Sequence, residues 1–191
     1  MSKIIDFYFD FISPYSYIAY KKIKSMQNKK GIDFNYKPIL LGGLHKLGNI
    51  TAPAFNERKM KNMKNDCEII ANKNNISFKW NEKFPINTLY LMRGALYAKK
   101  IGVINAYNKS IFNAMWIDNV NLNDPKNIAY ILSKNDLNSK EFMEAAENLE
   151  IKTELKKVTA EAVEKGLFGV PSFIVDNTLF FGQDRIRWFL N

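Results

Sequence analysis

A chain of 191 residues, of which 47% are hydrophobic, suits a single domain over residues 1–191. It has neither a signal-peptide pattern nor an apolar stretch long enough to span a bilayer, so we expect it to be soluble, cytoplasmic and not membrane-bound. The formal net charge of +9 raises the question of a nucleic-acid partner, but the lysines occupy polar positions of helix-like segments without any nucleic-acid-binding motif, so we expect a solvated surface and no nucleic acid. The single cysteine, Cys67, excludes an internal disulfide and a CxxC pair, and the single histidine, His45, disfavours a histidine triad or a multi-histidine metal site, so no metal is expected.

The first part of the chain predicts a strand, a helix and a second strand. Apolar and polar residues alternate over residues 3–11, which is the period of a strand. Ser13 and Pro14 then supply a favoured N-cap and a favoured first helical residue, and Gly31 ends the helical segment. Residues 33–39 form another strand-like run. A β-α-β opening normally places two parallel strands side by side through a right-handed crossover.

The middle of the chain, from about residue 53 to residue 166, is almost wholly helical in its pattern. Asp124–Pro125 is an N-cap followed by a first-turn proline, and Asn138 with Glu141 three residues later resembles a capping box. Gly166 is a plausible C-terminal stop for the last of these helices.

Strands return near the C-terminus. Residues 172–175 form a short apolar strand, Asp176–Asn177 a two-residue turn, and residues 178–181 the return strand. A short helix is predicted over residues 185–190. Without the helical block the order of elements is βαβ-ββα, which is the order of the thioredoxin core.

The predicted fold class is therefore α/β, a thioredoxin-like fold with a large all-helical insertion. The core comprises about residues 1–40 and 167–191, and the insertion about residues 53–166. A chain of two consecutive domains would not divide the strands of one sheet between its two ends.

Two segments, residues 9–16 and residues 168–172, are candidates for a functional site. Each also has a structural explanation, because Ser13 is a good N-cap and a proline before a strand can mark a sheet edge. Alternatively, Pro171 is a cis-proline that leaves the backbone of Val170 free to pair with an extended ligand.

In a thioredoxin core the two segments meet, so Ser13 and Pro171 are expected to flank one cleft. The helix N-terminus there offers unpaired N–H groups and a partial positive charge, which favour a thiolate. The chain carries Ser13 and Ser16 where redox relatives carry two cysteines, and serine cannot exchange disulfides. A thiol that reacts there must come with the ligand, and glutathione is the obvious candidate.

Three motifs carry a specific resemblance over essentially the whole chain. Residues 6–17 (DFYFDFISPYSY), 168–171 (FGVP) and 181–185 (FGQDR) resemble the opening and closing motifs of the 2-hydroxychromene-2-carboxylate isomerase family. These proteins are bacterial relatives of kappa-class glutathione transferases and of DsbA-type oxidoreductases. The resemblance implies a DsbA-like thioredoxin fold, glutathione as cofactor and a homodimer. Weaker matches lie at residues 48–49, 58–59, 84–88, 93 and 112–116.

The resemblance also implies roles for individual residues. Ser13 would hydrogen-bond the glutathione sulfur and hold it as a thiolate. The residues that would hold the rest of glutathione are Asn49, Lys59, Val170, Pro171, Gln183, Asp184 and Arg185. The residues that would line a second-substrate pocket are Asn87, Arg93 and Trp116. Structural roles stay open for three of these residues: Trp116 as a core aromatic, Arg93 as a helix-surface or buried-pair arginine, and Asp184 as a helix N-cap.

The implied activity is isomerisation, in which a glutathione thiolate adds reversibly to a small aromatic-derived carboxylate. One alternative is a conjugating transferase of the kappa type, from which the thioether product is released. Another is a non-catalytic thioredoxin-fold protein that only binds glutathione. A nucleic-acid binder rests on the net charge alone.

Overall fold

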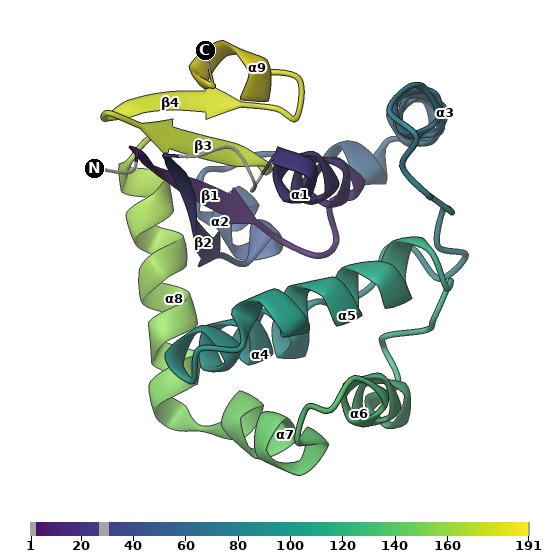
Figure 1. The fold of residues 1–191 in the computed structure, drawn as a ribbon, viewed down its shortest axis with the longest axis vertical. Helices are drawn as coiled ribbons and strands as arrows, with labels where there is room; N and C mark the ends of the chain where they lie inside the picture. Colours follow the sequence, from purple (N-terminus) through teal and green to yellow (C-terminus); the bar gives the residue numbers. More distant parts are fainter. Residues whose placement is uncertain (1–2, 27–30, 191) are drawn as a thin grey trace.

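The computed structural model describes residues 3–26 and 31–190 (Figure 1). Its elements begin as a βαβ unit and end as a ββα unit, as the sequence predicts. In chain order they are β1 (Lys3–Phe9), α1 (Pro14–Met26), β2 (Ile32–Pro38), α2 (Leu41–Leu47), a short 3-10 helix η1 (Pro53–Phe55), α3 (Glu57–Lys73), α4 (Leu89–Lys100), α5 (Ile104–Trp116), α6 (Pro125–Lys134), α7 (Ser139–Glu147), α8 (Leu149–Glu164), β3 (Ser172–Val175), β4 (Thr178–Phe181) and α9 (Ile186–Phe189).

Both ends of the chain contribute to one sheet. Within the described residues it is four-stranded, in the order β2-β1-β3-β4. Strand β1 is parallel to β2 and antiparallel to β3, and β3 is antiparallel to β4. Phe7 of β1 lies opposite Tyr36 on one side and Phe173 on the other. The fold is therefore thioredoxin-like, with the helices from α2 to α8 inserted between β2 and β3.

The inserted helices form the other end of the molecule. Figure 1 shows α6 and α7 farthest from the sheet, α4 and α5 between them and the sheet, and α8 running along one side from this helical part to the sheet. Helix α3 packs against α1 and η1. No helix in the described ranges is long and apolar enough to cross a membrane.

The helical region differs from its prediction in two places. The first helix after β2 begins at Leu41, well before residue 53, and residues 74–88 contain neither helix nor strand. The interruption starts where Asn75 adopts a left-handed φ of 53°, and it includes the cis bond between Phe84 and Pro85. A proline cannot donate a backbone hydrogen bond, so it does not continue a helix.

The alternation along β1 distributes its side chains between the two faces of the sheet. Ile5, Phe7 and Phe9 are fully buried in a large cluster shared with residues of α1, α4 and α5. Tyr8 belongs to a second cluster with residues of α2 and α8, among them Leu44. Helices therefore cover both faces, as expected for a thioredoxin-like α/β sheet.

The ends of several elements follow the predicted capping. Asp124 and Asn138 accept hydrogen bonds from first-turn amides of α6 and α7. Asp176 and Asn177 form the predicted turn, with positive φ of 48° and 63°. Gly166 ends α8 with a φ of 82°.

Two elements are shorter in the structure than in the sequence prediction. Strand β1 ends at Phe9 rather than at residue 11, because the chain turns there: the Ser13 amide donates to the Asp10 carbonyl oxygen at 3.1 Å. The last helix spans only Ile186–Phe189, and it follows a turn in which the Arg185 amide donates to the Gly182 carbonyl oxygen.

Candidate functional site

A buried hydrogen bond joins the N-terminus of α1 to the loop before β3. The Ser13 hydroxyl donates to the carbonyl oxygen of Val170 at 3.1 Å, and its Oγ accepts from the Ser16 amide at 3.1 Å. The Val170–Pro171 bond is cis, which confirms the prediction. We call Ser13, Ser16, Val170 and Pro171 the Ser13–Pro171 junction. Ser13 is thus both the N-cap of α1 and the link between the two predicted site segments.

The chain supplies no reactive thiol at this junction. Ser16 is fully buried, and its hydroxyl has no hydrogen-bond partner among the described residues. Cys67 lies in α3, also fully buried, and burial raises the pKa of its thiol well above the ordinary value. Since the thiolate is the nucleophile, a buried neutral thiol is inert.

Lys59, a predicted glutathione residue, lines a cavity between the start of α1, η1 and α3. The cavity has a volume of about 420 Å³, and Tyr15, two residues after Ser13, forms part of its wall. The Tyr15 hydroxyl donates to Asp66 at 2.7 Å, which ties α1 to α3. The complete lining is Tyr15, Pro53, Arg58, Lys59, Asn62 and Met63. Two cations beside apolar side chains suit an anion with an apolar part.

Asn49 lies on the chain between α2 and η1. Its side chain is exposed and its φ is 53°, a left-handed conformation that asparagine tolerates better than most residues. Its amide donates to the Lys46 carbonyl oxygen at 3.4 Å. The backbone geometry gives Asn49 a structural role in this turn, and its role toward glutathione stays a prediction.

The segment that carries Gln183 starts at the junction. The Gly182 amide donates to the Pro171 carbonyl oxygen at 2.9 Å, so the strand-to-helix turn is fixed to the cis-proline. The Gln183 side chain is buried and accepts a hydrogen bond from Lys22 of α1. Burial lowers the pKa of Lys22.

Gln183 and Asp184 line a cavity of about 610 Å³ between α1, the loop after α3, and α9. Asp184 is exposed and forms an ion pair with Arg185 at 3.6 Å. The Arg185 guanidinium stacks on Trp188, 4.1 Å from the ring centre. The N-cap of α9 is Arg185, so Asp184 does not take the alternative capping role.

The three residues predicted for the second substrate make contacts within the protein. The fully buried Trp116 donates its indole N–H to the Phe11 carbonyl oxygen at 2.9 Å. Arg93 donates to the Ala146 carbonyl oxygen of α7 at 3.1 Å. Asn87 accepts from the Leu89 amide at the start of α4. The structure therefore brings none of the three to the Ser13–Pro171 junction by a direct contact. Trp116 is a core aromatic, as its structural alternative states, whereas Arg93 is half-buried and bonds a backbone carbonyl oxygen.

Sequence reasoning assigned no role to Asp10, which lies three residues before Ser13. Its carboxylate is fully buried and accepts from the amides of Ile12 at 3.0 Å and Leu41 at 2.8 Å, and the buried Thr88 side chain also interacts with it. Burial outweighs these hydrogen bonds and raises its pKa from 3.8 to about 6. The signal in the sequence was an acidic residue between two phenylalanines, Phe9 and Phe11.

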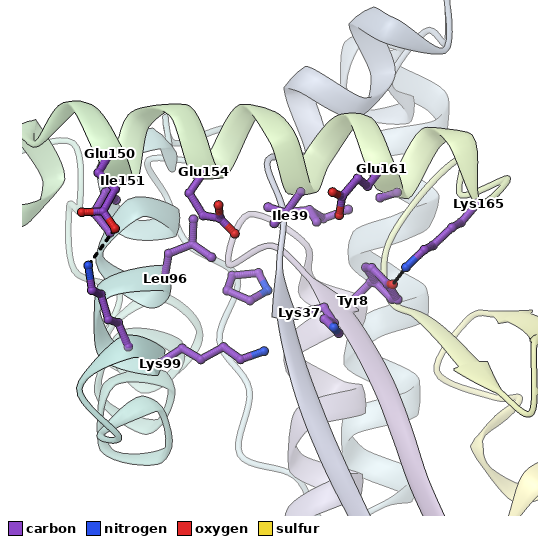
Figure 2. A pocket seen from close by; sticks show the side chains of 14 residues that line it. Tyr8, Lys37, Ile39, Leu96, Lys99, Glu150, Ile151, Glu154, Glu161 and Lys165 are labelled. Carbon is purple, nitrogen blue, oxygen red and sulfur yellow. Dashed lines mark hydrogen bonds and ion pairs between the residues drawn. The ribbon is translucent and has the colours of Figure 1, made fainter.

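A further cavity, of about 400 Å³, lies elsewhere (Figure 2). Residues of α4 and α8 and the ends of β1 and β2 line it, and none of the predicted site residues is among them. A Lys100–Glu150 ion pair at 2.8 Å and a Lys165–Tyr8 hydrogen bond at 3.4 Å lie at its margins. Within residues 3–26 and 31–190, no group of three or more histidine, cysteine or acidic side chains could hold a metal ion.

Comparison with known proteins identifies the family. The sequence profile of the DSBA-like thioredoxin domain matches residues 4–191, nearly the whole chain. The chain belongs to this family. Within the DSBA-like family, a solved structure of a 2-hydroxychromene-2-carboxylate isomerase superposes with a TM-score of 0.88 at 24% identity, covering 98% of this chain and 92% of that one.

Curated relatives of this DSBA-like chain agree with the resemblance found in its motifs. The 2-hydroxychromene-2-carboxylate isomerase of Sphingobium xenophagum is 28% identical over 188 residues, which is 97% of this chain and 95% of that protein. Glutathione S-transferase kappa 1 of Homo sapiens is 22% identical over 203 residues, 98% of this chain and 89% of that protein. The chain is thus similar, over nearly its whole length, both to a 2-hydroxychromene-2-carboxylate isomerase and to a kappa glutathione S-transferase.

Proposed function

We propose that this chain is a glutathione-dependent isomerase of the 2-hydroxychromene-2-carboxylate type, acting on a small aromatic carboxylate. The observation that carries the proposal is the Ser13–Pro171 junction, where a helix N-terminus meets a cis-proline through a serine instead of a cysteine. The positive end of the helix dipole favours an anion there, and a glutathione thiolate is such an anion. The names of the curated relatives support the same chemistry.

The junction fits an extended thiol peptide through an exchange of hydrogen bonds. An extended ligand pairs its backbone with the residue before the cis-proline, so its cysteinyl N–H would take the place of the Ser13 hydroxyl on the Val170 carbonyl oxygen. The Ser13 hydroxyl would then turn its hydrogen to the sulfur. The buried Ser16 hydroxyl, which lacks a partner among the described residues, is a further donor one helical turn away.

The remaining predicted residues hold the two ends of the peptide in this proposal. Lys59 lines the cavity beside Tyr15, and together with Asn49 it binds polar groups of the tripeptide. Gln183, Asp184 and Arg185 bind the γ-glutamyl end, where Asp184 faces its ammonium group. The ion pairs between these side chains and the charged ends of glutathione would be exposed to solvent, so they would contribute more to selectivity than to affinity.

When bound, glutathione supplies a thiolate that adds to an electrophilic carbon, turns a double bond into a rotatable single bond, and leaves unchanged on elimination. In this reaction Ser13 keeps the sulfur deprotonated, and Val170 and Pro171 fix the direction from which it attacks. Holding both reactants in one geometry supplies much of the rate enhancement.

A conjugating transferase of the kappa type is the second candidate, because the human kappa 1 enzyme matches over 98% of this chain. The same bound thiolate serves both reactions, and they differ in whether the adduct eliminates glutathione again. Trp116 and Arg93 make contacts within the protein, so their roles toward a second substrate rest on the family resemblance. The proposal includes a homodimer, which light scattering coupled to gel filtration would detect.

Calorimetric titration with reduced glutathione tests the proposal, with S-methylglutathione as the matched control. We expect saturable binding of glutathione at one site per chain and weaker binding of the thioether, because the thioether cannot form a thiolate. Incubation with a 2-hydroxychromene-2-carboxylate should then give an isomer with glutathione recovered. Recovery of a thioether adduct instead would favour the transferase, and no binding at millimolar glutathione would overturn both.

A further inference from the structure

Three segments that lead to the proposed glutathione and substrate residues converge on one buried side chain. Asp10 is fully buried, its Oδ1 accepts from the Ile12 amide at 3.0 Å, and its Oδ2 accepts from the Leu41 amide at 2.8 Å. The buried Thr88 side chain is the third group that interacts with this carboxylate. We infer that Asp10 is a positioning residue, a carboxylate that holds these three segments in register so that the site they carry is assembled.

Each of the three segments continues into residues assigned to the site. Ile12 directly precedes Ser13, whose amide also donates to the Asp10 carbonyl oxygen at 3.1 Å. Leu41 is the first residue of α2, and the chain reaches Asn49 two residues after that helix ends. Thr88 directly precedes α4 and directly follows Asn87. The significance of these positions for glutathione rests on the proposed function, whereas the convergence itself does not.

Stability alone does not explain a carboxylate at this position. Ionised Asp10 is less stable in the folded protein than in water even with its two backbone hydrogen bonds and the Thr88 side chain beside it, because burial outweighs these interactions. Uncharged side chains of similar volume commonly match or exceed the stability that a buried charged group provides. A carboxylate instead offers two oxygens that accept from several directions at once, which suits the joining of separate segments.

Asp10→Asn tests the inference because asparagine has the same shape and keeps only one acceptor oxygen. Hydrogen exchange of individual amides is measured first, in the protein without glutathione. If Asp10 couples the segments, the amides of Ile12, Ser13 and Leu41 exchange faster together, by about tenfold or more, since the opening free energy falls by ~1.4 kcal/mol for each factor of ten. Acceleration confined to one segment would overturn the inference.

Thr159→Val is the matched control. The Thr159 hydroxyl, on α8, accepts from the Leu40 amide at 3.1 Å, so this variant loosens the same start of α2 without touching Asp10. We expect it to accelerate exchange near Leu40 and to leave the Ser13 amide unchanged. Equal acceleration at Ser13 in both variants would mean that general loosening, and not Asp10, is responsible.

Glutathione affinity is the second measurement on the same proteins. Asp10→Asn should raise the dissociation constant of reduced glutathione about tenfold or more relative to Thr159→Val. Equal affinity of the two variants would overturn the positioning role. If the parent protein itself binds no glutathione, the proposed function fails, and the exchange pattern still decides whether Asp10 couples the three segments.

Should Asp10→Asn fail to fold, Thr88→Val provides the same test from the other side. It removes the Thr88 hydroxyl, which interacts with Asp10, and keeps the carboxylate with its two backbone partners. The amides of Ile12 and Leu41 donate to Asp10 and not to the Thr88 hydroxyl. Faster exchange of these two amides in Thr88→Val is therefore expected only if Asp10 couples the segments. Unchanged exchange at both amides would overturn the inference.

Discussion

The free energy of unfolding should change with pH because Asp10 binds its proton more tightly in the folded protein than in the unfolded chain. Its folded-state pKa of about 6 lies above the ordinary value of 3.8, so between these values the folded protein binds a proton that the unfolded chain does not. The free energy of unfolding then falls by about 1.4 kcal/mol for each pH unit, or about 3 kcal/mol over the whole window. This contribution is full below pH 3.8 and is lost as the pH rises through about 6.

Urea unfolding of the parent and of Asp10→Asn, from about pH 4 to about pH 7, measures this contribution. Burial lowers the pKa of His45, which gives stability the opposite slope with pH, but His45 is present in both proteins. The difference between the two curves therefore isolates Asp10. We expect the variant to gain about 3 kcal/mol relative to the parent across that range. Parallel curves would refute the reasoning, because they would mean that burial does not raise this pKa.

Two further substitutions test other parts of the structure. Ser13→Ala removes the N-cap of α1 and leaves the buried Val170 carbonyl oxygen without its donor. Urea unfolding should therefore show a free energy of unfolding lower by about 2–4 kcal/mol. A decrease below about 1 kcal/mol would contradict the double role of Ser13 as cap and link. Gly94→Ala places a Cβ 2.1 Å from the Tyr107 hydroxyl oxygen, so it should destabilise the protein by about 1–3 kcal/mol. Gly42→Ala, with nothing within 4 Å of the new Cβ, is its control and should cause no comparable loss.

The sheet and its helix caps could be predicted from local patterns. Alternating residues in β1, the capping residues Ser13 and Asp124, and the turn at residues 176–177 all act over a few positions in the sequence. The order of these elements was then enough for the thioredoxin-like fold, because few topologies accommodate a βαβ unit and a ββα unit in one sheet.

What could not be predicted depends on contacts between distant parts of the chain. The carboxylate of Asp10 meets Leu41 and Thr88 only after folding, so no local pattern gives its role. The sequence left two roles open for Trp116, a core aromatic or a residue lining the second-substrate pocket. Its hydrogen bond to Phe11, 105 positions away in the chain, favours the core role, and no local pattern predicts that contact. Residues 74–88 lack helix because the chain turns at Asn75, whose φ is 53°, and because Pro85 cannot donate a backbone hydrogen bond.

The thiol pKa of bound glutathione tests the central claim most directly. Thiolate absorbance is followed against pH in the glutathione complexes of the parent and of Ser13→Ala. One hydrogen bond to a charged acceptor contributes ~1.5–3 kcal/mol, so the bound thiol should titrate roughly 1–2 units higher in the variant. If the thiol titrates at the same pH in both complexes while the variant unfolds more easily, Ser13 is only a helix cap and the proposed mechanism is wrong.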